Sequence, residues 1–183
     1  MTKFYIVRHG QTDYNKEKRF QGRLDIPLNE TGLAQAKEIA ENLANVHFDA
    51  IYVSPLTRAK QTASEIINNH ADVECFEAPE IIERNFGEYE GEFSNVEPPY
   101  YGLWDRKLES GALKGGESID DVRARVFPFL DRLVQEREGQ TVCLVCHGGT
   151  GLVIREYFNG EPENGNYLNY PPISHGEAEI FEK

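Results

Sequence analysis

The 183-residue chain has little positive charge, few cysteines and no long hydrophobic run. Its 19 Lys and Arg side chains stand against 31 Asp and Glu, so the formal net charge is −12. A chain this acidic lacks the basic surface with which proteins bind nucleic acid or an anionic membrane. No apolar run approaches the roughly 20 residues that span a bilayer. We therefore expect neither a nucleic acid nor a membrane as a partner.

The 3 cysteines are too few, and odd in number, for a disulfide scaffold. Residues 1–8 are too short and too soon interrupted by charge for a signal peptide, so we expect a reducing, cytoplasmic setting. Cys143 and Cys146, followed by His147, have the spacing of a dithiol or haem-attachment motif. Their segment has the character of a buried strand, on which positions three apart face opposite sides. We predict two small buried hydrophobic side chains instead.

The composition predicts one globular domain over residues 1–183. Hydrophobic residues make up 39% and charged residues 27% of the chain, and there is no internal repeat, low-complexity tract or linker. Residues 84–117 differ from the rest, because they are rich in Gly, Glu and aromatic residues and have no long period. We expect an excursion or lid there, with one short helix near residues 101–108.

Strands and helices alternate over most of the chain. Apolar, β-prone runs predict strands at residues 3–8, 49–53, 73–76, 140–146 and 178–181. Helical periodicity predicts helices at residues 31–45, 54–67, 118–133 and 148–158. This alternation is typical of a layered α/β fold with a largely parallel sheet.

Several helices carry signals for where they begin. Asn29 or Thr31 is the expected N-cap of the first helix, and Ser54, followed by Pro55, that of the second. Ser118 begins the long helix with a capping-box pair. The apolar stripe expected on the first helix consists of Leu33, Ala36, Ile39, Ala40 and Leu43.

Histidine and arginine side chains follow three of the predicted strands. Arg8 and His9 end the first strand, Arg58 lies soon after the second, and His147 follows the strand at residues 140–146. Ligands of open α/β sheets bind at the carboxyl ends of the strands. We therefore predict that two imidazoles and two guanidinium groups converge in one crevice.

Such a crevice suits a phosphoryl group. Arginine forks match phosphate oxygens, and a neutral imidazole is a competent nucleophile toward phosphorus. Gly10 and Gly148, each directly after a histidine, are expected to let the ligand approach the backbone. Fixed guanidinium charges repel cations, and no carboxylate cluster is evident. We therefore expect no metal and no other cofactor.

The leaving oxygen of a phosphate ester needs a proton donor, for which Glu83 is the best candidate. It follows the apolar pair Ile81-Ile82, which we interpret as a strand end or edge, and precedes the irregular residues. A carboxylic acid at a desolvated rim can act first as general acid and then as base for water. Glu80, Glu88 and Glu90 lie close by in the sequence.

Six ordered motifs resemble those of the histidine phosphatase superfamily, which includes the phosphoglycerate mutases. They are RHGQTDYN at 8–15, FQGRLDIPLNETG at 20–32, SPLTRAKQTA at 54–63, the block from Glu83 through FGEYEG at 86–91, GGES at 115–118 and HGG at 147–149. The resemblance covers nearly the whole chain. It implies a three-layer sandwich, in which helices flank a mixed, mostly parallel sheet with one antiparallel strand.

The resemblance also implies roles for individual residues. His9 would be the phosphorylated nucleophile, Glu83 the proton donor, and no metal would be needed. The residues expected to bind the phosphate or the rest of the substrate are Arg8, Arg58, His147, Asn15, Gln21, Gly22 and Gly148.

Departures from the mutase pattern favour a phosphatase. Mutases of this family are generally longer, and they usually have tryptophan where this chain has Arg23. We expect hydrolysis of a small phosphorylated metabolite. A phosphoglycerate-type mutase and a phospho-ligand or protein-binding module with little turnover stay as alternatives. Substrate specificity is expected in residues 84–117 and 21–23, and the oligomeric state is left open.

The remaining histidines and aromatic residues receive plainer interpretations. His47, His70 and His175 are isolated near turns or helix ends, and we expect structural roles for them. Tyr100, Tyr101 and Trp104 either line the substrate mouth or pack the excursion against the core.

Overall fold

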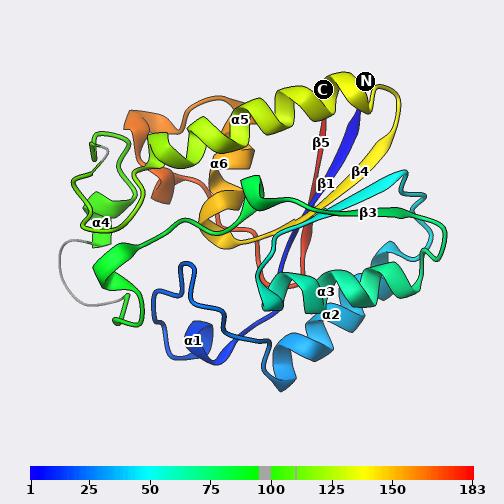
Figure 1. Cartoon of the computed structure of the whole chain (residues 1–183), viewed down its shortest axis with the longest axis horizontal. Helices are drawn as coiled ribbons and strands as arrows, with labels where there is room; N and C mark the ends of the chain where they lie inside the picture. Colours follow the sequence, from blue (N-terminus) through cyan, green and yellow to red (C-terminus); the bar gives the residue numbers. More distant parts are fainter. Residues whose placement is uncertain (95–99, 110) are drawn as a thin grey trace.

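The computed structural model describes residues 1–94, 100–109 and 111–183, which contain a five-stranded sheet of order β3-β2-β4-β1-β5 (Figure 1). Its strands are β1 (Lys3–Arg8), β2 (Ala50–Val53), β3 (Glu74–Glu77), β4 (Thr141–Cys146) and β5 (Ala178–Glu182). The first four strands run parallel to one another, and β5 runs antiparallel to β1. The predicted α/β fold with a mixed, mostly parallel sheet is confirmed.

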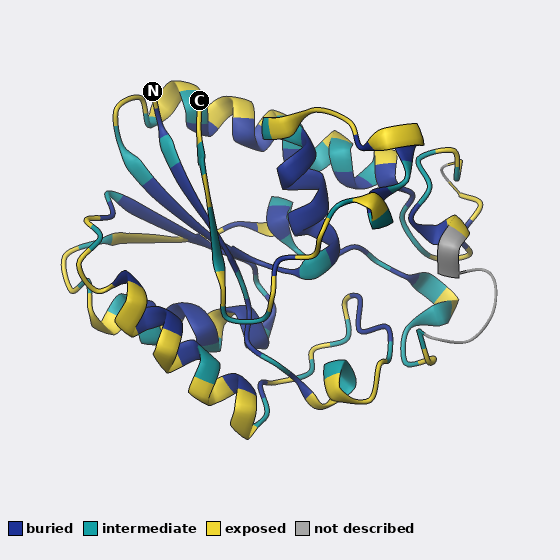
Figure 2. Cartoon of the chain, turned by 180° about the vertical axis from the view of Figure 1, so that it is seen from behind, coloured by how far each residue is buried: buried dark blue, intermediate teal, exposed yellow. Residues whose placement is uncertain are grey.

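Helices cover both faces of the sheet, and alternate strand residues supply the two cores (Figures 1 and 2). On β1, Phe4 and Ile6 pack toward α5 (Ile119–Glu136) and α6 (Gly148–Asn159). Tyr5 and Val7 pack on the other side, with the apolar faces of α2 (Glu30–Leu43) and α3 (Thr57–Asn68). Burial on both faces explains why the strands read as continuous apolar runs.

Cys143 and Cys146 are free, fully buried and members of opposite cores. Burial raises the pKa of Cys146 to about 12, and it raises the pKa of Cys143 still further. Both thiols therefore stay protonated, and the prediction that they are small core side chains is confirmed.

The first turn of α2 packs through glycine rather than through its apolar stripe. Asn29 caps the helix by accepting the N–H of Gly32, as predicted. A Cβ on Gly10 would lie 2.3 Å from the carbonyl oxygen of Gly32, so the two backbones are in direct contact. This contact turns Leu33 outward, where it is 40% exposed, and its predicted place in the core is wrong. The predicted use of Gly10 for ligand approach is wrong too, because α2 occupies that space.

The expected start of α3 at Ser54 is wrong, because the helix begins at Thr57. The carboxylate of Asp25 accepts both the backbone N–H and the hydroxyl of Thr57 at 2.7 Å. Asp25 therefore caps the first turn of α3, and the residue at the N-cap position itself contributes no side-chain hydrogen bond. By contrast, Ser118 caps α5 in a capping box with Asp121, as expected.

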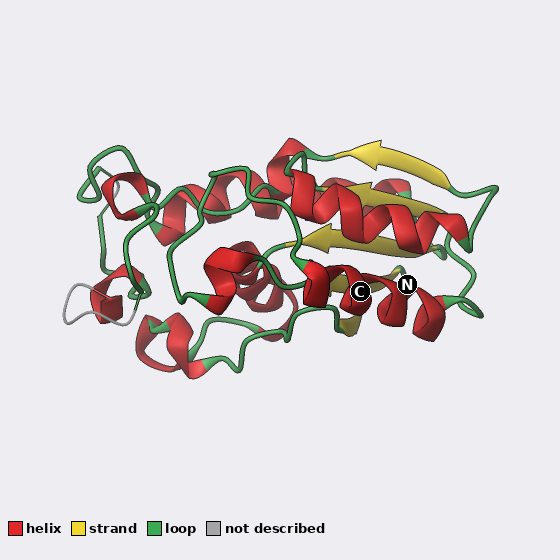
Figure 3. Ribbon diagram, turned by 90° about the horizontal axis from the view of Figure 1, so that it is seen from below, coloured by secondary structure: helices red, strands yellow, loops and turns green. Residues whose placement is uncertain are grey.

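The excursion extends beyond the carboxyl ends of the strands (Figure 3). The short elements at this end are α1 (Asp13–Lys16), η1 (Pro79–Ile81), η2 (Gly87–Tyr89), α4 (Tyr100–Leu103), η3 (Glu163–Gly165) and η4 (Tyr167–Asn169). Ile81 thus ends a 3-10 turn instead of the predicted strand, because Pro79 cannot donate to a ladder. The predicted helix near 101–108 is shorter and starts earlier. The side chains of Tyr100 and Tyr101 lie outside the described part of the chain.

Arg84 anchors the start of the excursion. Its guanidinium is fully buried and donates to the carbonyl oxygens of Glu117, at 2.7 Å, and Leu103. It also lies over the rings of Phe86 and Trp104, at 5.4 and 5.6 Å. Both ends of the excursion are therefore fastened to one buried cation.

Candidate active site

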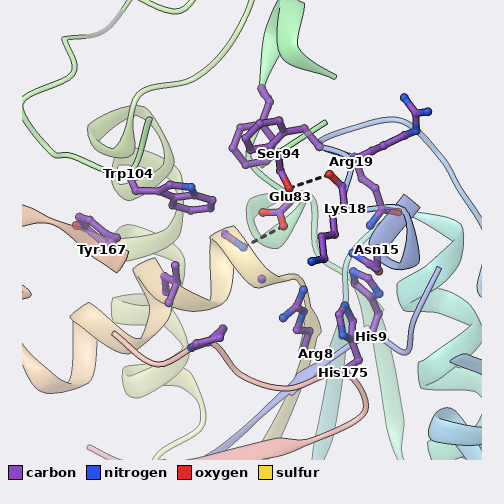
Figure 4. Close-up of a pocket in the computed structure, with 18 of the residues that line it drawn as sticks. Arg8, His9, Asn15, Lys18, Arg19, Glu83, Ser94, Trp104, Tyr167 and His175 are labelled. Carbon is purple, nitrogen blue, oxygen red and sulfur yellow. Dashed lines mark hydrogen bonds between the residues drawn. The ribbon is translucent and has the colours of Figure 1, made fainter. Parts of the chain in front are cut away.

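A pocket of about 430 Å³ opens at the carboxyl ends of the parallel strands (Figure 4). The predicted site residues that line it are Arg8, His9, Asn15, Gln21, Gly22, Arg58, Glu83 and Gly148. His147 is fully buried, with its ring centroid 5.1 Å from that of His9. The structure therefore brings every one of the predicted site residues together.

His9 is held as a neutral imidazole. It is 2% exposed, and burial, with Arg58 and Arg8 next in importance, lowers its pKa well below the ordinary value. Its Nδ1 lies 2.7 Å from the carbonyl oxygen of Gly10, which makes Nδ1 the donor. Nε2 accepts from Nε of Arg58 at 3.2 Å. Nε2 therefore carries the lone pair, as a nucleophile requires, and in this structure that lone pair accepts the hydrogen bond from Arg58.

His147 is also neutral, since burial and Arg58 lower its pKa well below the usual range. Its Nε2 lies 2.6 Å from the hydroxyl oxygen of Ser54, the residue that does not cap α3. Its Nδ1 is buried and has no hydrogen-bond partner in the described residues. Ser54 therefore orients a ring that still has one unused nitrogen.

Two guanidinium groups supply the positive charge, that of the fully buried Arg58 and that of the partly buried Arg8. Arg58 donates to the carbonyl oxygens of Leu24, at 2.8 Å, and Gly22, at 2.7 Å. Burial lowers its pKa to about 10, so it stays charged at neutral pH. Arg8 donates from Nη1 to the carbonyl oxygen of Ile173 at 2.8 Å, and its buried Nε has no partner in the described residues. The fixed cations favour an anionic ligand.

Glu83 lies at the N-terminus of α6, on the far side of the pocket from His9 (Figure 4). Its Oε2 accepts the N–H of Gly149 at 3.0 Å. Its Oε1 accepts the N–H groups of Arg84 and Thr150, at 2.7 and 2.9 Å, and the Thr150 hydroxyl at 3.2 Å. Oε2 therefore has fewer partners and is the oxygen more open to a ligand.

Comparison with known proteins agrees with this geometry. The profile of the histidine phosphatase superfamily (branch 1) matches residues 4–181. The chain belongs to the histidine phosphatase superfamily. It is 36% identical over 175 residues to a metal-independent phosphoserine phosphatase of Arabidopsis thaliana, covering 92% of this chain and 74% of that protein.

The chain is also similar to a phosphoglycerate mutase and to a solved structure. A 2,3-bisphosphoglycerate-dependent phosphoglycerate mutase of Gloeobacter violaceus is 36% identical over 173 residues, covering 89% of this chain and 78% of the mutase. The structure of Bacillus stearothermophilus YhfR superposes with a TM-score of 0.84 at 27% identity and covers 100% of this chain and 91% of that one. The chain is thus an enzyme of a superfamily that contains both phosphatases and mutases.

The pocket contains two further residues that the sequence analysis did not assign to a site. His175, expected to be structural, lines the pocket with its ring centroid 5.9 Å from that of His9. The His175-Gly176 pair precedes a predicted strand instead of following one, so the strand-end rule that located the other two His-Gly pairs does not apply to it. Lys18 also lines the pocket, with its side chain directed inward (Figure 4). Its backbone is left-handed, with φ 58°, and its carbonyl oxygen accepts two hydrogen bonds from Ser94.

Trp104 serves both of the roles considered for it. It is 8% exposed and belongs to the core, and it also lines the pocket of this histidine phosphatase superfamily enzyme. In the described residues, no group of three or more His, Cys, Asp or Glu side chains could hold a metal ion. No helix in that part of the chain is long and apolar enough to cross a membrane.

Proposed function

We propose that the chain is a metal-independent phosphatase that hydrolyses a small phosphate monoester through a phosphohistidine on His9. The observation that supports this best is the state of His9: a neutral ring, fixed through Nδ1, with its lone pair on Nε2 and with the Arg8 and Arg58 charges beside it. Such a nucleophile needs no general base of its own. Arg8 and Arg58 stabilise the negative charge on the transferring phosphoryl oxygens.

The first step moves the phosphoryl group from substrate to enzyme. Nε2 of His9 forms a bond to phosphorus while the bond to the ester oxygen breaks. Glu83, protonated for this step, gives its proton from Oε2 to the departing oxygen and becomes a carboxylate. The N–H groups of Gly149 and Thr150 hold that carboxylate in place.

The second step returns the enzyme to its starting state. Glu83 takes a proton from a water molecule as the water oxygen attacks phosphorus. The phosphorus–nitrogen bond to His9 breaks, and inorganic phosphate leaves. One carboxyl group thus acts as acid and then as base, and the protons balance over the cycle.

The test is phosphate release from a panel of phosphate monoesters in the presence of a chelator. We expect hydrolysis of at least one small ester, and loss of about 10³-fold or more of kcat in His9→Ala, as expected when a nucleophile is removed. His47→Ala is the matched control, because the His47 side chain is 89% exposed. Full activity of His9→Ala would contradict the proposal.

A phosphoglycerate-type mutase is the second candidate, favoured by the mutase among the similar proteins. Offering a phosphosugar acid separates the two, since a mutase transfers the phosphoryl group to an acceptor while a phosphatase releases it. Predominant transfer would replace hydrolysis as the function. Tight binding of one ester without turnover of any would indicate a binding module.

A further inference from the structure

The segment before β5 is fastened to Arg8 by three hydrogen bonds. Nη1 of Arg8 donates to the carbonyl oxygen of Ile173 at 2.8 Å. The backbone of Arg8 accepts from the N–H of Gly176 at 3.0 Å and donates to the carbonyl oxygen of Glu177 at 3.2 Å. Residues 173–177 therefore keep a fixed position beside the phosphoryl-binding end of the pocket.

The backbone of this segment determines where His175 lies. The N–H of Glu177 donates to the carbonyl oxygen of Ser174 at 3.2 Å, which closes a β-turn with His175 and Gly176 at its corners. Gly176 has φ 70°, as the third residue of a type II turn requires. A Cβ at Gly176 would also lie 2.8 Å from Cβ of Gln35. The turn thus presents His175 toward the site in one orientation.

The ring of His175 has an unused nitrogen within the pocket. Figure 4 shows Arg8, His9 and His175 together at one end of the pocket. Nε2 of His175 is buried and has no hydrogen-bond partner in the described residues. Burial, with the nearby Arg8 charge, lowers the pKa of His175 to about 4, so the ring is neutral at pH 7 and carries one N–H. A buried polar atom without a partner costs free energy until a ligand supplies one.

Two more buried nitrogens close to His9 also have no hydrogen-bond partner among the described residues. They are Nε of Arg8 and Nδ1 of His147. A phosphoryl group has three non-bridging oxygens, each able to accept a hydrogen bond. Resting on the proposed function, we infer that His175 is a further phosphoryl-binding residue, whose Nε2–H donates to a non-bridging oxygen of the group held at His9.

The experiment measures binding of inorganic phosphate to the full chain by calorimetry. His175→Phe keeps a ring and removes the donor, whereas His175→Gln places an amide N–H near the position of Nε2. We expect His175→Phe to weaken phosphate binding by about 10-fold or more, as for a lost hydrogen bond to a charged group. His175→Gln should stay within about 3-fold of the natural chain. Ser174→Ala, an exposed neighbour on the same turn, is the matched control.

Thermal unfolding and turnover separate this role from a structural one. A phosphoryl contact predicts a Tm in His175→Phe that is unchanged or higher, because an unpartnered buried nitrogen is removed, together with slower phosphoenzyme formation. His175→Gln should rescue both binding and rate. Phosphate binding by His175→Phe equal to that of the natural chain would overturn the inference, even with phosphatase activity intact. Equal losses in both variants with a lowered Tm would overturn it as well. Failure of the natural chain to hydrolyse any ester would instead contradict the proposed function.

Discussion

The charge state of each site residue follows from the side chains beside it. Burial keeps His9, His147 and His175 neutral, helped by Arg58 and Arg8 at His9 and His147 and by Arg8 at His175, because a protonated ring would be desolvated next to fixed positive charges. The same arginines stay charged at neutral pH although burial lowers their pKa. The site thus combines permanent cations with neutral nitrogens, an arrangement that suits an anionic ligand and an uncharged nucleophile.

Lys18 illustrates a residue whose conformation conflicts with its type. Its φ of 58° is unfavourable for a residue with a Cβ, and its ammonium forms no ion pair with the described residues. We predict that Lys18→Gly raises the free energy of unfolding by about 0.5–1 kcal/mol. It should also raise KM about 5- to 10-fold for an ester whose leaving group is anionic.

Urea denaturation and steady-state kinetics check this prediction. Asn164→Gly is the matched control, because Asn164 has φ 57° and does not line the pocket. It should gain less stability, since asparagine tolerates this conformation, and leave KM unchanged. A lower free energy of unfolding in Lys18→Gly, or an unchanged KM, would show that Lys18 does not contribute in this way.

The residues directly after strands were predictable from the sequence, whereas Lys18 and His175 were not. Arg8, His9 and His147 follow apolar runs, so strand prediction alone places them at one edge of the sheet. The place of Lys18 depends on a left-handed backbone angle, and that of His175 on a β-turn fastened to Arg8. Neither angle nor turn leaves a periodic pattern in the sequence.

Helix α6 links the position of Glu83 to the fold. Its first N–H groups, from Gly149 and Thr150, hold the carboxyl group, while His147 stands at its N-cap position. The start of α3 was harder to predict, because its capping carboxylate comes from Asp25, distant in the sequence. Ser54 is thereby left to orient His147. Helix existence follows from local periodicity, but capping by a distant residue requires the tertiary structure.

Gly149 gives a prediction at the scale of this element. A Cβ there would lie 2.7 Å from Oε1 of Glu83 and 3.3 Å from the Trp104 ring, so Gly149→Ala must displace the carboxyl group. We expect kcat to fall by about 10- to 100-fold, as for a misplacement of about 1 Å, with Tm nearly unchanged. Gly151→Ala on the same helix meets only the tip of Ile173, at 3.3 Å, and should keep its activity. Equal kinetics for the two variants would contradict this role of α6.

For the whole molecule, the buried neutral histidines predict a stability that depends on pH. Their folded-state pKa values lie below the ordinary 6.5 of the unfolded chain. Below about pH 6.5 the unfolded state therefore binds more protons, and the free energy of unfolding falls as the pH falls. Each histidine contributes up to about 1.4 kcal/mol per pH unit until its own folded pKa is reached.

Urea denaturation between about pH 6.5 and pH 5, above the range of most carboxylates, measures this slope. His175→Gln should reduce this slope by up to about 1.4 kcal/mol per pH unit, because it removes one group that binds a proton in the unfolded state but not in the folded state. Above about pH 6.5 these residues should add no pH dependence. A free energy of unfolding that stays constant or rises on acidification through this window would contradict the assignment of neutral rings.

The central claim is that the phosphoryl group passes through Nε2 of His9. It is tested most directly by rapid mixing with a radiolabelled phosphate ester, quenching in denaturant without acid, and locating the label on the chain. We predict an acid-labile, alkali-stable phosphoenzyme that forms within the first turnover, carries its label on His9 and is absent from His9→Ala. No protein-bound label during turnover, or an acid-stable label on another residue, would contradict the account.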